Sequence, residues 1–140
     1  MSLTAAETST RADASAFTAL IEPWTSACVA RDWGALLAMC TDDVGFSPPN
    51  EPLVEGSAAV RSFLETFPTI KAMAWDIDHL ESAGDLAWLR GWVRMTLDVS
   101  GQSVDFNGKY ADVCRRSPDG AWRFAFVMWS SNEAAPGGPA

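Results

Sequence analysis

The feature that most constrains the fold of this chain is a series of four strand-like runs between residues 69 and 131. Short polar turns separate the runs, with GD at 84–85, SG at 100–101 and SPDG at 117–120. Apolar residues alternate along the runs, as they do in strands that bury one face. Connections this short join antiparallel neighbours. The second half of the chain is therefore predicted to form a four-stranded antiparallel meander.

The first half of the chain shows helical periodicity instead. Apolar residues recur at helical spacing from Asp13 to Arg31, and Pro23 predicts a kink about one turn upstream of itself. Asp32 is suited to cap a short second helix, and residues 58–67 have the apolar spacing of a third. A brief strand is expected at residues 44–47. Helices followed by strands predict an α+β domain, with about three N-terminal helices packed on one face of a curved antiparallel sheet.

The turn at residues 100–101 determines which residues share the inner face of the sheet. If this turn has two residues, Asp112 lies opposite Leu89. Tyr110, two residues from Asp112, then shares its face. The Gly-Asp turn places His79 opposite Leu89 as well, in the row that contains Asp112. This face is the apolar one, which the helices are expected to cover.

The last hairpin is expected to extend the same face. The SPDG connection places Ala125 opposite Asp112 and Val127 opposite Tyr110, with Trp129 pointing the same way. A one-residue bulge in any strand would reverse such an assignment.

The charge balance excludes several classes of partner. The 140 residues carry a formal net charge of −8, from ten Lys and Arg against eighteen Asp and Glu. Nucleic acids and anionic membranes attract proteins through clustered basic side chains, so neither is an expected partner. No run approaches the length of a membrane span, and the N-terminus lacks the apolar stretch of a signal peptide. The expected location is the cytoplasm.

Length and cysteine content indicate a single domain in a reducing compartment. One core is expected at residues 13–132, between flexible polar tails at 1–12 and 133–140. The three cysteines are odd in number and lack C-x-x-C spacing, so buried free thiols are expected rather than disulfides or a zinc site. No phosphate loop or metal cluster is found, so neither a cofactor nor a metal is predicted.

Four segments of the chain carry a resemblance to a known family. They are WTSACVARDWGALLAMCTDDVGFSPPNEPLVEGSAAVRSFL, GDLAWLRGWVRMTL, GKYADVCRRSPDGAW and MWSSN. Together they resemble the nuclear transport factor 2-like superfamily, and within it the SnoaL-like and ketosteroid isomerase-like proteins of bacteria. The resemblance implies a cone-shaped fold in which the sheet curls around the long helix and leaves a pocket at the open end. The superfamily includes isomerases, polyketide cyclases, dehydratases and plain binding or assembly domains, so the fold implies no single activity.

The resemblance indicates Asp112 as the principal candidate catalytic residue. It stands where ketosteroid isomerases have a protonated Asp that donates to the developing oxyanion. Burial on an apolar face would favour this neutral form. The alternative is an Asp bound to a backbone N–H or to an Arg near the sheet end. Trp24 replaces the isomerase's oxyanion Tyr, and SPPN at 47–50 supplies no base, so steroid isomerisation by the known constellation is not expected.

Tyr110 and His79 are the remaining candidate catalytic residues. Tyr110 could orient a ligand carbonyl or hydroxyl, and the alternative is a core tyrosine satisfied by the protein. His79, the sole histidine, could be a general base, and the alternative is an exposed or structurally bonded strand histidine. A direct bond between His79 and Asp112 is not expected, because a strand lies between them.

The seven tryptophans are predicted to divide between the two faces of the sheet. A predicted ligand wall combines inner tryptophans with apolar residues of the strands, namely Trp24, Trp75, Leu89, Val93, Val127 and Trp129. The outer face is predicted to carry Trp88, Trp92 and Trp122. Large apolar area on that face favours a homodimer interface.

Two functions remain open from the sequence. The first is binding of a small hydrophobic, carbonyl-bearing molecule, with an isomerase, cyclase or dehydratase activity that uses Asp112 with Tyr110 or His79. The second is a non-catalytic homodimeric module for binding or assembly, with a vestigial pocket. An open cavity in which the three residues reach one ligand atom favours the first. A cone filled by tryptophan side chains favours the second.

Overall fold

The structure, a computed structural model, describes residues 14–134. The predicted tail at residues 1–12, and residues 135–140 of the predicted C-terminal tail, lie outside this range. The helices and strands are α2 (Ile21–Ala30), α3 (Trp33–Ala38), β1 (Cys40–Ser47), β2 (Val54–Glu55), α4 (Ser57–Glu65), β3 (Thr69–Ala83), β4 (Leu86–Val99), β5 (Gln102–Arg116) and β6 (Trp122–Ser131). This order confirms the predicted α+β class. No helix among the described residues is long and apolar enough to span a membrane.

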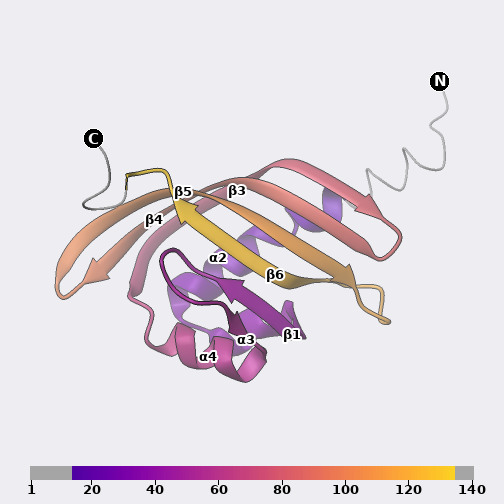
Figure 1. The fold of residues 1–140 in the computed structure, drawn as a ribbon, viewed down its shortest axis with the longest axis horizontal. Coiled ribbons are helices and arrows are strands. Elements are labelled where there is room, and N and C mark those ends of the chain that lie inside the picture. The colour runs from indigo at the N-terminus through magenta and orange to yellow at the C-terminus, as the bar shows by residue number, and fades with distance from the viewer. Residues whose placement is uncertain (1–13, 135–140) are drawn as a thin grey trace.

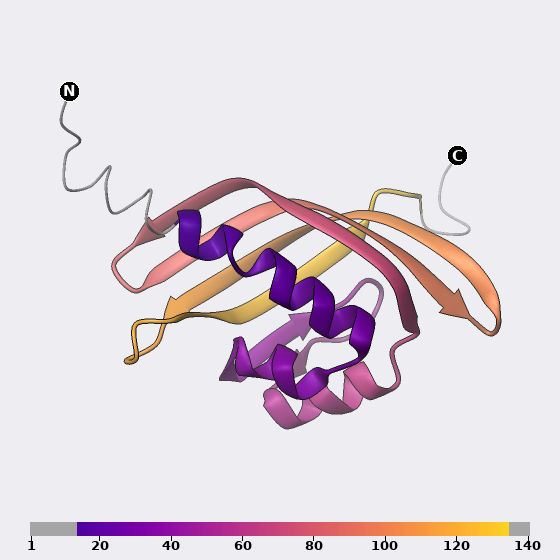
Figure 2. The same cartoon turned by 180° about the vertical axis from the view of Figure 1, so that it is seen from behind.

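The six strands of the described chain form one sheet, in the order β2-β1-β6-β5-β4-β3. The predicted meander, β3 to β6, is antiparallel throughout, whereas β1 lies parallel to β6. The long strands arch over α2, while α3 and α4 lie beside β1 at the lower end (Figures 1 and 2). The short β2 and the parallel pairing of β1 are the parts of the sheet that were not predicted.

The N-terminal helical stretch breaks where Pro23 predicts. Residues 14–18 are helical, a turn follows at residues 19–20, and α2 begins after it. The cause is the proline ring, which has no N–H and conflicts with the carbonyl four residues earlier. Asp32 caps α3 as predicted, because its carboxylate accepts a hydrogen bond of 3.1 Å from the Ala35 N–H.

Strands β4 and β5 pair in the predicted register. The two turn residues, 100–101, both have positive φ, as a type I′ hairpin turn requires. Asp112 lies opposite Leu89, and Tyr110 lies opposite Gly91. Tyr110 and Asp112 are both buried, on the side that faces the helices.

The register of β3 against β4 overturns the predicted position of His79. Across the two-residue turn at 84–85, Ala83 pairs with Leu86, and this register places His79 opposite Arg90. A bulge then shifts the register by one residue between Ile77 and His79, so the predicted pairing holds only for residues 72–77. Leu80 therefore lies opposite Leu89, and His79 lies on the outer face.

The register of β6 also differs from the prediction. The connection from β5 is one residue longer than predicted, so Arg116 pairs with Trp122, and a bulge follows between Phe124 and Phe126. Asp112 lies opposite Val127 rather than Ala125, and Tyr110 lies opposite Trp129 rather than Val127. The longer connection and the bulge each shift the register by one residue. Together they leave the alternation of faces beyond the bulge unchanged, so Val127 and Trp129 face the helices as predicted.

Trp122, predicted on the outer face, is buried on the inner one. It is 7% exposed, and its ring lies 5.0 Å from that of Phe17 in the helical residues before α2. The bulge lies between Trp122 and Val127, so both point inwards despite their spacing. Only Trp88 and Trp92 of the predicted outer set are on the outer face, with 39% and 38% of their surface exposed.

Candidate functional site

A cavity of about 80 Å³ lies between the helices and the concave face of the sheet. Among the residues that line it, Asp112 supplies the one carboxyl group, and the rest of the wall is largely apolar. Seven aromatic residues contribute to this wall: Trp24, Trp33, Phe46, Phe67, Trp75, Tyr110 and Trp129. An aromatic lining with few polar groups is typical of sites for flat apolar ligands.

Asp112 brings an unsatisfied polar atom to this apolar wall. The residue is 6% exposed, and its Oδ1 atom is enclosed without a hydrogen-bond partner among the described residues. Burial raises the pKa of the carboxyl well above its usual range, and a hydrogen bond with the backbone of Met128 opposes this shift. Burial therefore favours the neutral acid, whose proton Oδ1 can donate to a ligand.

Tyr110 lies beside Asp112, but its hydroxyl is already engaged. It donates a hydrogen bond of 2.9 Å to the backbone carbonyl of Asp76, across β4. Gly91 makes this approach possible, because a Cβ atom there would clash with that carbonyl and lie 2.9 Å from the Tyr110 hydroxyl. Tyr110 thus has the geometry of a core tyrosine satisfied by the protein, although its ring lines the cavity. Burial also raises the pKa of its hydroxyl.

His79 lies outside the cavity. Its Nε2 atom is 2.9 Å from a carboxylate oxygen of Glu81, and its ring packs on Trp88 with the centroids 5.0 Å apart. Its side chain is 37% exposed, on the face of the sheet opposite to Asp112. The predicted grouping of His79 with Asp112 and Tyr110 is therefore wrong.

Five of the six residues in the predicted ligand wall line the cavity: Trp24, Trp75, Val93, Val127 and Trp129. Trp75 is held in place by a hydrogen bond of 2.9 Å from its indole N–H to the Thr25 hydroxyl. Leu89 faces the same side of the sheet but is fully buried in the core, and it is not part of the lining.

The part of the wall that sequence reasoning missed comes from the short helices and from single residues of α2, β1, β3 and β4, namely Cys28, Phe46, Ile70, Met73 and Met95. Trp33 and Leu36 of α3 line the cavity, as do Leu64 and Phe67 at the end of α4. Their helical spacing is a signal of burial. Spacing alone does not distinguish a buried residue that packs in the core from one that borders a cavity.

Half-buried residues mark the entrance. Phe67, Met73 and Trp129 line the cavity and are partly exposed, whereas Asp112 lies at depth. The rings of Phe67 and Trp129 meet nearly edge to face, with centroids 6.4 Å apart. This contact joins the segment after α4 to the end of β6 at the partly exposed side of the cavity.

The cysteines are not activated as nucleophiles in this environment. Cys28 lines the cavity, and burial raises its pKa to about 12 and that of Cys40 to about 12. The thiolate is the reactive form, so neither thiol is an activated nucleophile. All three cysteines are free and buried, as expected. Within residues 14–134, no three His, Cys, Asp or Glu side chains converge as metal ligands.

A curved sheet closed by helices around an apolar cavity defines a recognised class of small α+β protein. The sequence matches the SnoaL-like domain family over residues 11–125. Since the match spans most of the chain, this protein belongs to the SnoaL-like domain family. No curated protein matches the chain.

Solved structures share the fold at low sequence identity. A ketosteroid isomerase-like protein from Erwinia carotovora atroseptica has a TM-score of 0.71 at 22% identity, over 83% of this chain and 96% of that chain. An NTF2-like protein with a cystatin-like fold from Novosphingobium aromaticivorans has a TM-score of 0.76 at 19% identity, over 94% of this chain and 90% of that chain. A candidate dehydratase of the NTF2-like family from Streptomyces avermitilis has a TM-score of 0.72 at 17% identity, over 89% of this chain and 99% of that chain. The likeness shows an NTF2-like fold.

Proposed function

We propose that this protein binds a small, apolar molecule that carries a carbonyl or a similar oxygen acceptor. The observation that carries the proposal is the Oδ1 atom of Asp112, enclosed without a partner in an otherwise apolar wall. A buried polar atom left unpaired costs on the order of 1–3 kcal/mol. A ligand oxygen that accepts the Asp112 proton would remove this cost, while the aromatic rings contact the rest of the ligand.

The ligand is proposed to be uncharged. Within residues 14–134, the cavity wall contains no Lys or Arg side chain that could balance an anion. The neutral form of Asp112 offers no charge to a cation, and ionising a buried carboxyl to attract one would be costly. An uncharged molecule meets neither penalty.

The chemistry that this arrangement supports is polarisation of the ligand oxygen. In an isomerase, cyclase or dehydratase that acts on a carbonyl compound, a neutral carboxylic acid can stabilise the negative charge that develops on oxygen. The hydroxyl of Tyr110 is engaged by the backbone, and His79 faces away, so neither supports the role of base. We therefore propose binding as the primary function, and carbonyl polarisation as the catalytic contribution of Asp112.

Two variants of Asp112 test the proposal. Asp112→Asn keeps the size and an N–H donor, whereas Asp112→Leu removes the donor. Cyclopentanone, followed by thermal shift and tryptophan fluorescence, should bind the wild type and bind Asp112→Leu roughly three- to tenfold more weakly. Cyclopentane, which has no acceptor, should bind both equally. Equal affinity of cyclopentanone for all three proteins would refute the role of Asp112, and an absence of binding to the wild type would refute the ligand proposal.

A second candidate function, a non-catalytic homodimeric binding or assembly module, is favoured by the outer face of the sheet. Trp88 and Trp92 are exposed there on β4, and Met128 of β6 is 43% exposed. The Arg94 guanidinium lies 4.9 Å from the Trp92 ring centroid. Aromatic residues, Met and Arg on one face are typical of protein interfaces. We propose a second copy of this chain as the partner at this face.

A further inference from the structure

We propose that Arg31 limits the size of the ligand by latching the end of α4 over the entrance of the cavity. The inference rests on the proposed binding function. It adds a residue that lies outside the cavity wall and controls access to it. We use the name latch for the hydrogen bonds that the Arg31 guanidinium donates to backbone carbonyls at the end of α4.

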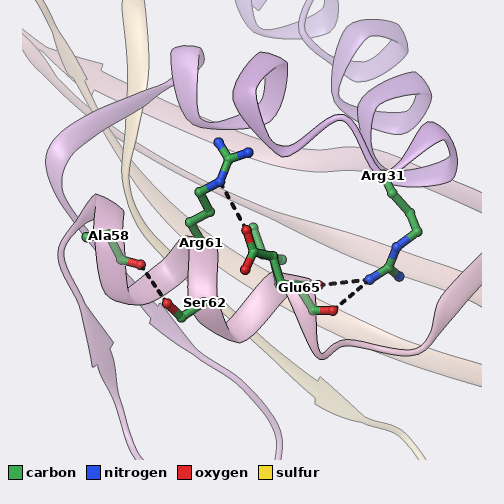
Figure 3. Close-up of polar contacts among 6 residues, drawn as sticks. Arg31, Ala58, Arg61, Ser62 and Glu65 are labelled. Atoms are coloured by element: carbon green, nitrogen blue, oxygen red, sulfur yellow. Dashed lines mark hydrogen bonds and ion pairs between the residues drawn. The ribbon is translucent and has the colours of Figure 1, made fainter.

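The latch spans two segments that are far apart in the sequence. Arg31 donates hydrogen bonds of 2.9 Å to the carbonyl of Phe67 and 3.0 Å to that of Glu65, with a longer one of 3.4 Å to Leu64. Figure 3 shows its side chain reaching from the end of α2 to the last turn of α4. Arg31 ends α2 in the left-handed conformation, with φ of 56°. This conformation is common at the end of a helix, and the Arg31 N–H bonds there to carbonyls of α2.

The end of α4 needs an external partner. The last carbonyls of a helix have no partner within the helix, and a positive charge beside them is favourable. The last turn of α4 contains no basic residue. Arg31 supplies both the donors and the charge from the neighbouring helix. The Leu64 carbonyl also accepts a hydrogen bond of 3.1 Å from the Phe67 N–H. Removal of the guanidinium would therefore leave the Glu65 and Phe67 carbonyls to water and would weaken the attachment of α4 to α2.

The latched segment carries the wall and the entrance of the cavity. Leu64 and Phe67, two of the residues whose carbonyls Arg31 binds, line the cavity through their side chains. The Phe67 ring meets Trp129 at the entrance. The Arg31 guanidinium also lies 5.4 Å from the ring centroid of Trp33, another lining residue. One side chain therefore holds two walls of the cavity together.

The size of the cavity makes this attachment consequential. Its volume is about 80 Å³, whereas sites for drug-sized ligands are typically about 300–1,000 Å³. With the latch closed, the cavity therefore accepts only very small molecules. A two-ring ligand requires the segment of Leu64 and Phe67 to move away from Trp129, and the latch opposes this movement.

Cysteine labelling tests the latch without any ligand. Cys28 lines the cavity, whereas Cys40 and Cys114 are buried outside its lining and report on unfolding of the core. Methyl methanethiosulfonate, with site-resolved detection by peptide mass spectrometry, should label Cys28 about tenfold faster in Arg31→Met than in the wild type. The labelling rates of Cys40 and Cys114 should stay unchanged.

Arg61→Met is the matched control. Arg61 pairs with Glu65 of the same helix at 3.2 Å, with both side chains about half exposed (Figure 3). Exposed pairs of this kind contribute little, so this variant should label like the wild type. The latch is refuted if Arg31→Met accelerates all three cysteines together, or if it does not differ from Arg61→Met.

A ligand series separates failure of the latch from failure of the proposed function. Arg31→Met should accelerate association of 2-acetylnaphthalene by about tenfold and leave the affinity for cyclopentanone within twofold. If cyclopentanone binds the wild type but Arg31→Met changes neither Cys28 labelling nor 2-acetylnaphthalene association, the latch fails and the binding function stands. If neither ketone binds any variant while Cys28 labelling is selectively accelerated, the binding function fails and the latch controls access to an unliganded cavity.

Discussion

Asp112 is the residue at which stability and proposed function conflict. Its carboxyl is buried with one oxygen unpaired, whereas buried polar groups in proteins are almost always hydrogen-bonded. A chain selected for stability alone would place an apolar residue opposite Leu89 and Val127. Its place in the wall of a cavity offers a reason for retaining it, because a ligand can complete its hydrogen bonding.

The Asp112→Asn variant should gain stability relative to the wild type as the pH rises. Burial raises the pKa of Asp112 in the folded protein above its ordinary value of 3.8, so the folded chain holds this proton more tightly than the unfolded chain. Below about pH 4, the proton on Asp112 contributes fully to the free energy of unfolding. This contribution falls by about 1.4 kcal/mol per pH unit as the pH rises towards the folded-state pKa. Asn does not titrate. Urea unfolding of both proteins from pH 4.5 to 7.5 measures the difference, and a difference independent of pH would contradict a raised pKa.

Tyr110→Phe should alter stability and leave binding unchanged. The variant loses the hydrogen bond to the Asp76 carbonyl, which should lower the free energy of unfolding by about 1 kcal/mol. Its ring remains in the wall, so the dissociation constant for cyclopentanone should stay within twofold. Urea unfolding and ligand titration of the same samples give both quantities. A tenfold loss of affinity with unchanged stability would make Tyr110 a ligand-binding residue instead.

At the scale of elements, the sequence predicts a register wherever a turn of definite length controls it. The two residues at 100–101 leave one pairing for β4 and β5, so the positions of Tyr110 and Asp112 are predicted correctly. His79 and Trp122 are misplaced because the predicted pairing at the other two turns is one residue off: Ala83 pairs with Leu86, and Arg116 pairs with Trp122. The bulges in β3 and β6 have no comparable local signal, and each moves the side chains beyond it to the other face.

The start of α3 depends on the Asp32 cap. Asp32→Ala should lower the free energy of unfolding by about 1 kcal/mol, because the Ala35 N–H loses its partner. Asp78→Ala is a suitable control, since its pair with Arg90 is 3.6 Å long and exposed. We expect a change below about 0.5 kcal/mol there. Equal losses in the two variants, measured by urea unfolding, would mean that the cap contributes nothing specific.

At the scale of the whole molecule, the architecture is predictable and the cavity is only partly so. The order of helices and strands follows from periodicity and turns, and the family resemblance agrees with it. The volume of the cavity depends on how the side chains of α3, α4 and the sheet pack together. A change in one rotamer can fill such a space, and no pattern in the sequence reports the rotamer.

The proposed dimer predicts an effect of charge on the outer face. Trp92→Glu should convert a dimer to a monomer, because the variant brings a charge into an apolar contact. Leu53→Glu is the control, since Leu53 is 49% exposed on the loop between β1 and β2. Sedimentation velocity at micromolar concentration distinguishes the two states. A wild type that sediments as a monomer would refute the outer-face dimer.

The position of β6 also has a consequence for synthesis of the protein. The last of the described strands to leave the ribosome, β6, lies between β1 and β5, so it joins the first half of the described chain to the meander. Until it emerges, β1 lacks its parallel partner, β5 has an open edge, and the wall that Val127 and Trp129 complete is missing. Open edges pair readily with other chains, and contacts between distant residues form slowly. The nascent chain therefore remains prone to aggregation until its final strand is inserted.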